Sequence, residues 1–547
     1  MKKNWWKESV IYQIYPRSFK DSNGDGIGDL GGIIEKLDYL KLLGIDILWL
    51  SPIFKSPNDD NGYDVSDYRA IMDEFGTMED FDRLLKGVHS RGMKLILDLV
   101  PNHSSDEHHW FQESCKSEDN LYADYYYWEK EPASNWLSFF GGSTWEYDKQ
   151  RQAYYLHLFS KKQPDLNWEN PKVRQAIYDV MHFWLQKGID GFRIDVLPFL
   201  SKRLDFPDID LTQFPKNILE VYANGPRLHE FLQEMNEEVC SKYDMMTMGE
   251  GPGVKSDNAL QYIGEDRKEI NMLYHFDYLT INYGKGGKYD PVPWSLTDLK
   301  KIFLKWHQAI GEAGWINICL DNHDFPRMVS HYGNDNQYRV ESAKLLAILL
   351  LSMRASPCIY QGSEIGMTNI ILDSIEEHDD LEAKNLYREW EAAGKDTTPL
   401  FQAIQMQGRD NARTPMQWNN SNHAGFTDSN PWMKVNPNHT FINVEAALKN
   451  KNSIFYFYKK MLELRKTYKT LVYGDFELLA ADSEQIFAYR RWDEEHEFII
   501  LLNFSEATIP SSSIIDLVNC SLLLGNYPNE SPDLQAWEAR LYIKIKP

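Results

Sequence analysis

Short apolar runs that end on polar residues recur along the first 360 positions of the chain. Each run predicts a strand, because strands of a parallel sheet are buried on both faces. The predicted strands are 10–16, 45–50, 94–100, 191–196, 245–250, 270–279, 316–324 and 356–362. Helical periodicity lies between many of them, at 32–43, 78–91, 171–187 and 341–354. Alternation of strands and helices predicts a parallel sheet, and about eight such units predict an α/β fold with a closed (β/α)8 TIM barrel.

Two regions depart from this alternation. Residues 104–171 are rich in Trp, Tyr, Ser and Asn and have little helical period, which predicts a small domain inserted after the third strand. Beyond about residue 470, short alternating runs predict a separate antiparallel β-sandwich domain. The expected organisation is a first barrel part (1–103), an inserted domain B (104–171), a second barrel part (172–469) and a C-terminal β domain (470–547).

Composition narrows the classes of function. The net charge of -23 argues against binding nucleic acid or an anionic membrane. No run of about 18 apolar residues predicts a membrane span, and no apolar segment follows the basic N-terminus. The five cysteines are scattered without metal-ligand spacing, which indicates reduced thiols and a cytoplasmic protein. Aromatic residues make up 14% of the chain, and their flat rings suit the faces of sugars.

Several predicted strands end on acids or histidines. Arg193 and Asp195 share one face of the strand 191–196, and taken alone they could be a buried structural ion pair. The other strand ends carry a similar set, namely Asp98, Asn102 and His103, then Glu250, then His323 and Asp324. Active sites of such barrels form at the carboxyl ends of the strands. We therefore expect these side chains to meet in one hollow.

Three acids in one pocket favour glycoside hydrolysis. Like charges raise one another's pKa, so that one carboxylate can attack a sugar while another holds a proton for the leaving oxygen. Arg193 is expected to keep Asp195 anionic, and Glu250 has no obvious basic neighbour in its own segment and is the better proton donor. Metal-dependent hydrolysis is the rival chemistry. It is weaker, because the chain has no paired zinc-ligand motif.

A Gly-rich turn early in the chain predicts a metal site. Alternating Asp and Asn oxygens are typical of Ca²⁺ or Mg²⁺ ligands, but Gly32 stands where an EF-hand needs its bidentate Glu. The expected structural ion is held by Asp21, Asn23, Asp25, Asp29 and the carbonyl of Ile27. A plain Asx-turn loop is the alternative.

Taken together, the motifs strongly resemble the α-amylase superfamily of glycoside hydrolases, and in particular its oligo-1,6-glucosidase and α-glucosidase branch. The resemblance spans essentially the whole chain and rests on the segments 98–103, 191–195, 249–250 and 322–324, with 163–168 and 409–418 typical of the branch. It implies a retaining mechanism with Asp195 as nucleophile, Glu250 as general acid and base, and Asp324 as stabiliser of the transition state. It further implies that the terminal glucose is bound by Asp64, Tyr63, His103, Arg193, His323 and Arg413.

The resemblance also bears on cofactors and specificity. It implies one structural Ca²⁺ or Mg²⁺ in the loop 21–29, no organic cofactor, a small oligosaccharide as substrate, and a monomer or homodimer. Val196, directly after the nucleophile, resembles the α-1,6-preferring members, whereas α-1,4-preferring members carry a smaller or hydroxylated residue. Departures from the branch pattern include residues 197–199, 251–252 and Phe325 near the leaving-group side, and Ser363 where an acid is usual.

Alternatives remain open at this point. Within the family they are a sucrose-active hydrolase or isomerase, an α-1,4-glucosidase and a trehalose-phosphate hydrolase. The residues 320–327 resemble those of the isomerases, but the Arg-rich loop expected of them afterwards is missing. The last alternative is a non-catalytic, transporter-associated relative, which would need a membrane span and usually a broken catalytic set.

Overall fold

A computed structural model describes residues 3–215 and 217–545, and it contains an eight-stranded parallel barrel. The sheet order is β11-β10-β9-β5-β2-β1-β15-β14, and a parallel bridge between Leu273 and Ile316 joins the two ends. The strands are β1 (Ile11–Ile14), β2 (Ile47–Leu50), β5 (Lys94–Leu99), β9 (Gly191–Ile194), β10 (Met246–Gly251), β11 (Met272–His275), β14 (Asn317–Ile318) and β15 (Ser356–Tyr360). The barrel expected from the sequence is confirmed.

Helices surround the barrel, and the longer ones have clear start and stop signals. In α6 (Pro171–Lys187), Pro171 stands in the first turn, the side chain of Asn170 caps the N-terminus, and Gly188 ends the helix in a left-handed conformation. The other barrel helices include α2 (Leu30–Glu35), α3 (Leu37–Leu43), α4 (Met78–Ser90), α8 (Leu228–Glu238), α10 (Leu296–Ile310), α12 (Arg339–Ser352) and α17 (Ile454–Thr467). The single helix expected at 32–43 is two helices, broken at Lys36.

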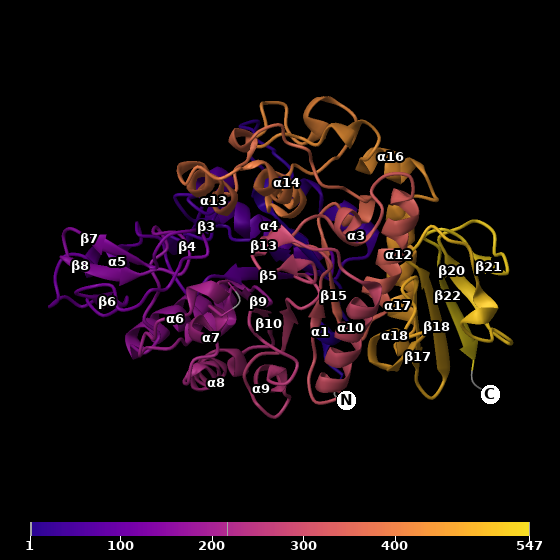
Figure 1. Ribbon diagram of the computed structural model, residues 1–547, viewed down its shortest axis with the longest axis horizontal. Coiled ribbons are helices and arrows are strands. Elements are labelled where there is room, and N and C mark those ends of the chain that lie inside the picture. The colour runs from indigo at the N-terminus through magenta and orange to yellow at the C-terminus, as the bar shows by residue number, and fades with distance from the viewer. Residues whose placement is uncertain (1–2, 216, 546–547) are drawn as a thin grey trace.

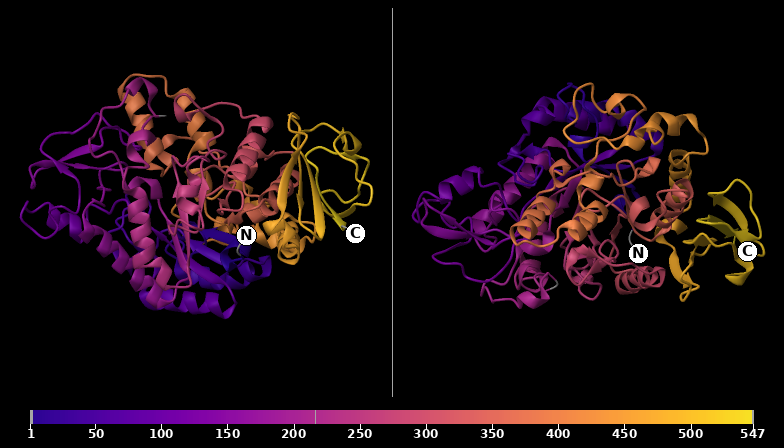
Figure 2. Two further views of the ribbon diagram at one scale, coloured as in Figure 1. Left: turned by 90° about the horizontal axis from the view of Figure 1, so that it is seen from below. Right: turned by 45° about the horizontal axis from the view of Figure 1, so that its top comes forward.

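Two smaller sheets lie at opposite ends of the molecule in all views (Figure 1, Figure 2). The segment between β5 and α6 holds α5 (His109–Ser114) and an antiparallel sheet of β6 (Trp128–Glu129), β8 (Ala153–Leu156) and β7 (Trp145–Asp148). The C-terminal sheet has the order β16-β17-β18-β22-β20, from β16 (Asp475–Leu479) to β22 (Ala539–Ile545). The remaining strands of this sheet are β17 (Ile486–Trp492), β18 (His496–Asn503) and β20 (Ser521–Gly525).

Several strands are shorter than the apolar runs that predicted them. The strand expected at 191–196 ends at Ile194, so that Asp195 lies in the turn beyond the sheet. The run 316–324 forms only the two-residue strand β14 before the chain turns at His323 and Asp324. Just beyond these strands, the N–H of Val196 donates to the carboxyl group of Glu250 and the N–H of Asp324 donates to Oδ1 of Asn322, and the site is built on these turns.

A long connection follows β15 and precedes α17. It contains α13 (Leu381–Ala392), α14 (Thr398–Gln407) and α15 (Asp410–Arg413), shown in orange in Figure 1. Asn385 of α13 donates from Nδ2 to the carbonyl of Phe140 in the inserted segment, at 3.0 Å. Two parts of the chain that are 245 residues apart therefore meet on the same side of the barrel. In the described part of the chain, no helix is long and apolar enough to cross a membrane.

Candidate active site

One guanidinium gathers three carboxyl groups from neighbouring barrel strands. Arg193 of β9 is fully buried, and its Nη1 donates to Asp98 of β5 at 2.8 Å and to Asp195 at 2.6 Å. Its Nη2 lies 2.8 Å from Oε2 of Glu250 on β10. Because one planar group binds all three acids, Asp195 and Glu250 face the same hollow. The convergence expected at the carboxyl ends of the strands is present.

A strained turn fixes the residue after Asp195. Val196 has φ 34° and ψ 45°, in the left-handed region that a β-branched residue rarely adopts. In this conformation its N–H donates to Oε2 of Glu250 at 2.9 Å, and the hydroxyl of Tyr274 donates to Oε1 at 3.1 Å. The turn thus connects the backbone beside Asp195 to the carboxyl group of Glu250. Strain of this kind persists where the surrounding contacts hold it.

The cluster around Arg193 has more acids than cations. Burial raises the pKa of Asp195 well above its ordinary value, Arg193 opposes the rise, and Glu250 and Asp98 add to it. Burial also raises the pKa of Asp98 to about 6, against the lowering effect of Arg193. The sequence predicted that Arg193 keeps Asp195 anionic, whereas the structure divides the guanidinium among three acids and the pKa of Asp195 lies above its ordinary value. Such a cluster retains a proton and titrates as a unit.

Asp324 lies in a different electrostatic environment. Its carboxylate is 3.0 Å from Nη2 of Arg413, 3.1 Å from Nε2 of His323 and 3.7 Å from Nη1 of Arg409. Burial alone raises the pKa of Asp324, but His323, Arg413 and Arg409 together hold it well below its usual range. Asp324 is therefore ionised at neutral pH. It can supply a fixed negative charge.

Tyr63, His323 and His103 form a wall of rings near these acids. Tyr63 stacks on His323 with ring centroids 5.2 Å apart, and its hydroxyl lies 3.0 Å from Asp98 and 2.6 Å from Nε2 of His323. His103 is buried beside the carbonyl of Tyr63 and the amide of Gln163. Burial lowers the pKa of His103 to about 4 and that of His323 to about 3. Both rings are therefore neutral at pH 7, and each has one nitrogen that donates and one that accepts a hydrogen bond.

Asp64 is not placed with the other predicted sugar ligands. Its carboxylate accepts hydrogen bonds from the hydroxyl of Ser56 and from the amides of Asp59 and Asp60, at 2.8–3.0 Å. Asp60 is also buried, but its Oδ1 accepts no hydrogen bond and lies 3.2 Å from Nη1 of Arg409. Sequence reasoning missed Asp60, although two adjacent acids before Asn61-Gly62 could have signalled a functional turn.

Arg409 was also missed as a site residue. It joins Asp60, Asp324 and Asp380, the last by a hydrogen bond of 2.7 Å, and its guanidinium lies 5.0 Å from the ring of Phe140. Its neighbour Arg413 keeps one free donor, because Nη1 is buried without a hydrogen-bond partner. Oδ1 of Asp60 is ion-paired with Arg409 but accepts no hydrogen bond, so it and Nη1 of Arg413 are one acceptor and one donor, which suits a hydroxyl group.

The predicted metal loop is held by its own hydrogen bonds. Asp21 accepts from the amides of Asn23, Gly24 and Gly26 and from the hydroxyl of Thr427. Asn23 and Asp25 accept from the amides of Asp25 and Ile27, while Asp29 caps α2 through the amide of Gly32. Within residues 3–215 and 217–545, no three His, Cys, Asp or Glu side chains gather as a metal-binding group. The metal site stays a prediction.

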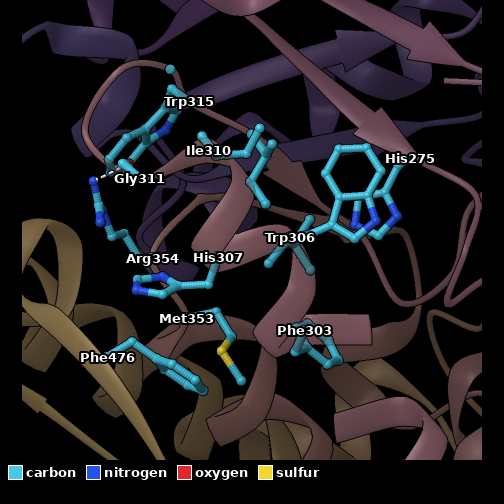
Figure 3. Close-up of a pocket in the computed structure, with 13 residues that line it drawn as sticks. His275, Phe303, Trp306, His307, Ile310, Gly311, Trp315, Met353, Arg354 and Phe476 are labelled. Atoms are coloured by element: carbon cyan, nitrogen blue, oxygen red, sulfur yellow. Dashed lines mark hydrogen bonds between the residues drawn. The ribbon is translucent and has the colours of Figure 1, made fainter. Parts of the chain in front are cut away.

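A separate small cavity lies outside the barrel wall, against α10 (Figure 3). It measures about 30 Å³ and is lined mainly by apolar side chains, with His275 stacked on Trp306 at 3.7 Å. This volume holds one or two water molecules at most. None of the acids described above lines it, so it is not the candidate active site.

The comparisons with known proteins agree with this geometry. Residues 13–474 match the alpha amylase catalytic domain. The sequence is 53% identical to the oligo-1,6-glucosidase of Parageobacillus thermoglucosidasius over 99% of both chains, and 53% identical to that of Bacillus cereus over the full length of both. Among solved structures, the chain is similar to an isomaltulose synthase mutant of Erwinia rhapontici NX5 in complex with sucrose. Their TM-score is 0.96 and their identity 43%, with both chains fully covered.

Proposed function

Because the chain belongs to the alpha-amylase family, we propose that it is a retaining, exo-acting α-glucosidase that removes terminal glucose from short α-1,6-linked oligosaccharides. The observation that carries the proposal is the pairing of Asp195 and Glu250 with one guanidinium, at 2.6 and 2.8 Å. A nucleophile and an acid must both reach one glycosidic bond, and pairing with the same guanidinium keeps them close together. In retaining enzymes the two carboxyl groups are roughly 5–5.5 Å apart.

A retaining mechanism gives the acids of this cluster separate roles. Asp195 attacks the anomeric carbon, and a covalent glucosyl-enzyme forms as the glycosidic bond breaks. Glu250 gives its proton to the leaving oxygen, then takes a proton from the water that hydrolyses the ester. The hydrogen bonds from Val196 N–H and Tyr274 support this role, because they fix both carboxyl oxygens of Glu250. Asp324, kept ionised by its cations, stabilises the positive charge that develops on the sugar.

The terminal glucose is held by groups that keep unused hydrogen-bonding capacity within the protein. One hydroxyl of the sugar donates to Oδ1 of Asp60 and accepts from Nη1 of Arg413, both of which are buried without hydrogen bonds. Tyr63 and His103 provide the wall against which the ring packs. His323 and Arg193 complete the set proposed from the sequence, with Arg193 acting through the acids that it binds.

An exo mode of action is supported by the contacts around this end of the barrel. Asn385 binds the carbonyl of Phe140, and the guanidinium of Arg409 lies over the Phe140 ring. Asn61 also donates to Asp379, at 3.2 Å, which ties the loop after β3 (Phe54–Lys55) to the segment before α13. A groove for a long polysaccharide has to be open at both ends. Contacts that bridge two walls favour a pocket for a chain end.

The α-1,6 preference is supported by the names of the relatives and by Val196. This side chain is 8% exposed and packs with Phe199 in the cluster between the barrel and the inserted segment. A branched side chain there limits how the leaving sugar can lie, but such an effect gives only about 10–200-fold discrimination. Sucrose isomerisation is the second candidate, because the similar solved structures are sucrose isomerases.

Two measurements test this proposal. Isomaltose, maltose, sucrose and trehalose are compared by kcat/KM, and isomaltose is expected to be the best substrate. Proton NMR then identifies the anomer of glucose that is released in the first turnovers. An enzyme that retains the anomeric configuration releases α-glucose. Release of β-glucose would contradict the retaining mechanism, and conversion of sucrose to an isomeric disaccharide without net hydrolysis would favour the second candidate.

We also propose that the loop 21–29 binds one structural Ca²⁺ or Mg²⁺. Its donor set is entirely oxygen, which suits a hard cation. Burial raises the pKa of Asp21, but the hydrogen bonds from Thr427 and three amides bring it below its ordinary value, so a carboxylate is available. Addition of Ca²⁺ to EDTA-treated protein should raise Tm, and Asp21→Asn should abolish that rise. An equal rise in the variant would remove the loop as the site.

A further inference from the structure

Asp64 is a fully buried carboxylate that turns away from the candidate active site. Its Oδ1 accepts from the hydroxyl of Ser56 at 2.9 Å and from the amide of Asp60 at 3.0 Å, and its Oδ2 accepts from the amide of Asp59 at 2.8 Å. All three donors belong to the single loop that precedes it. The carboxylate therefore acts on the shape of residues 56–60.

This loop needs such support because its backbone is strained. Asn58, Asn61 and Gly62 have φ values of 66°, 49° and 98°, all in the left-handed region. A non-glycine residue in this region persists only where its surroundings hold it. Side chains of the inserted segment supply a second restraint, since Ser160 donates to Asp59 at 2.5 Å and Gln163 donates to Asp60 at 3.2 Å.

The loop carries one group that faces the sugar site. Asp60 is 5% exposed, lies 3.2 Å from Arg409 and keeps Oδ1 free of hydrogen bonds. Its amide is held by Asp64, so a loss of that hydrogen bond changes the position of its carboxylate. Displacement of a binding group by about 1 Å can reduce activity by about 100-fold.

We propose that Asp64 is a positioning residue that fixes Asp60 for binding of the terminal sugar, through the 56–60 loop. The inference rests on the proposed function, because it assigns to Asp60 a hydroxyl of the substrate. Asp64 itself does not touch the sugar. This positioning role replaces the direct contact with the terminal glucose that the sequence predicted for Asp64.

A double-mutant cycle tests the proposal on the full-length protein, with isomaltose as the probe. Asp64→Asn keeps the size of the side chain but loses at least one acceptor, so kcat/KM should fall about tenfold or more, mainly through KM. In the Asp60→Asn background the same change should cost less than about threefold, because the group that it positions is already gone. Ser56→Ala removes one hydrogen bond to Asp64 and should give a smaller effect that also disappears in that background.

Asp190→Asn is the matched control. Asp190 likewise accepts a backbone amide, that of Leu95 at 2.9 Å, but it precedes β9 at the opposite end of the strands. It should change neither KM nor kcat. Thermal unfolding identifies variants that fail to fold, in which case Ser56→Ala carries the test.

The outcomes separate two failures. If Asp64→Asn and Ser56→Ala leave KM unchanged, or if their effects persist undiminished in the Asp60→Asn background, Asp64 does not act through Asp60. The same holds if Asp60→Asn has native kcat/KM. If the unaltered protein cleaves none of the α-glucosides, the proposed function fails instead.

Discussion

Replacement of Asp195 by Asn should separate activity from stability. The substitution keeps the size of the side chain and removes one negative charge from the cluster in which Arg193 binds Asp98, Asp195 and Glu250. An amide cannot attack the anomeric carbon, so kcat should fall by about 10⁴-fold or more. The fold should survive, because Arg193 keeps its ion pairs with Asp98 and Glu250.

The structure also gives the sign of the stability change. Burial raises the pKa of Asp195 above its unfolded value, with Arg193 opposing. A carboxyl group of this kind contributes stability that is present below its unfolded pKa, near 4, and lost as pH rises through its folded pKa. Asparagine does not titrate and avoids this loss. The stability of the variant should therefore rise relative to that of the wild type as the pH increases.

Calorimetry between pH 4.5 and 8 measures this difference beside kcat on isomaltose. The Tm of the variant relative to that of the wild type should increase as the pH rises. Glu250→Gln serves as the comparison, since it removes an acid from the same guanidinium but leaves the nucleophile in place. Near-native turnover of Asp195→Asn would refute the assignment of the nucleophile. A large loss of stability at every pH would refute the account of an acid-rich cluster.

Three further predictions concern other residues. Asp98→Asn removes a neighbouring charge that raises the pKa of Asp195, so the acid limb of the kcat/KM profile should move to lower pH; a fixed limb would contradict the coupling. Val196→Thr should raise the maltose-to-isomaltose ratio of kcat/KM by about tenfold, and an unchanged ratio would remove Val196 as a linkage determinant. Burial lowers the pKa of His108 to about 3, so its contribution to stability is present above pH 6.5 and lost in acid. His108→Asn should keep the cap on α5. Between pH 7 and pH 5, its free energy of unfolding in urea should fall by about 2 kcal/mol less than that of the wild type, and equal decreases would contradict this.

The elements that the sequence predicted best are those with local signals. The helix α6 has Pro171 at its start, Asn170 as its cap and Gly188 at its end, and its bounds were predicted at 171–187. The barrel strands are apolar runs between turn residues, which a buried parallel strand requires. Ends of strands were less certain. Nothing in the composition near Asp195 shows that the chain leaves the sheet there and turns through a left-handed valine.

Contacts between distant segments could not be predicted. Asp60 and Asp64 are the same residue type four positions apart, and only the folded loop decides which carboxylate binds its own backbone and which faces Arg409. Arg409 lies in the turn directly after α14, and its partner Asp60 lies 349 positions earlier. The bridge between Asn385 and Phe140 is a contact of the same kind. Local preferences carry no information about such pairs.

The ratio of cations to acids divides the candidate site into two halves with different chemistry. Around Arg193, one cation meets three carboxyl groups, so a proton stays bound and the pKa of Asp195 and Asp98 rises. Around Asp324, the cations Arg409 and Arg413 converge, and its pKa falls. The cluster around Arg193 can exchange a proton with a reacting sugar, whereas Asp324 provides only a fixed negative charge. A retaining glycosidase needs both, and the same residue type supplies them because its neighbours differ.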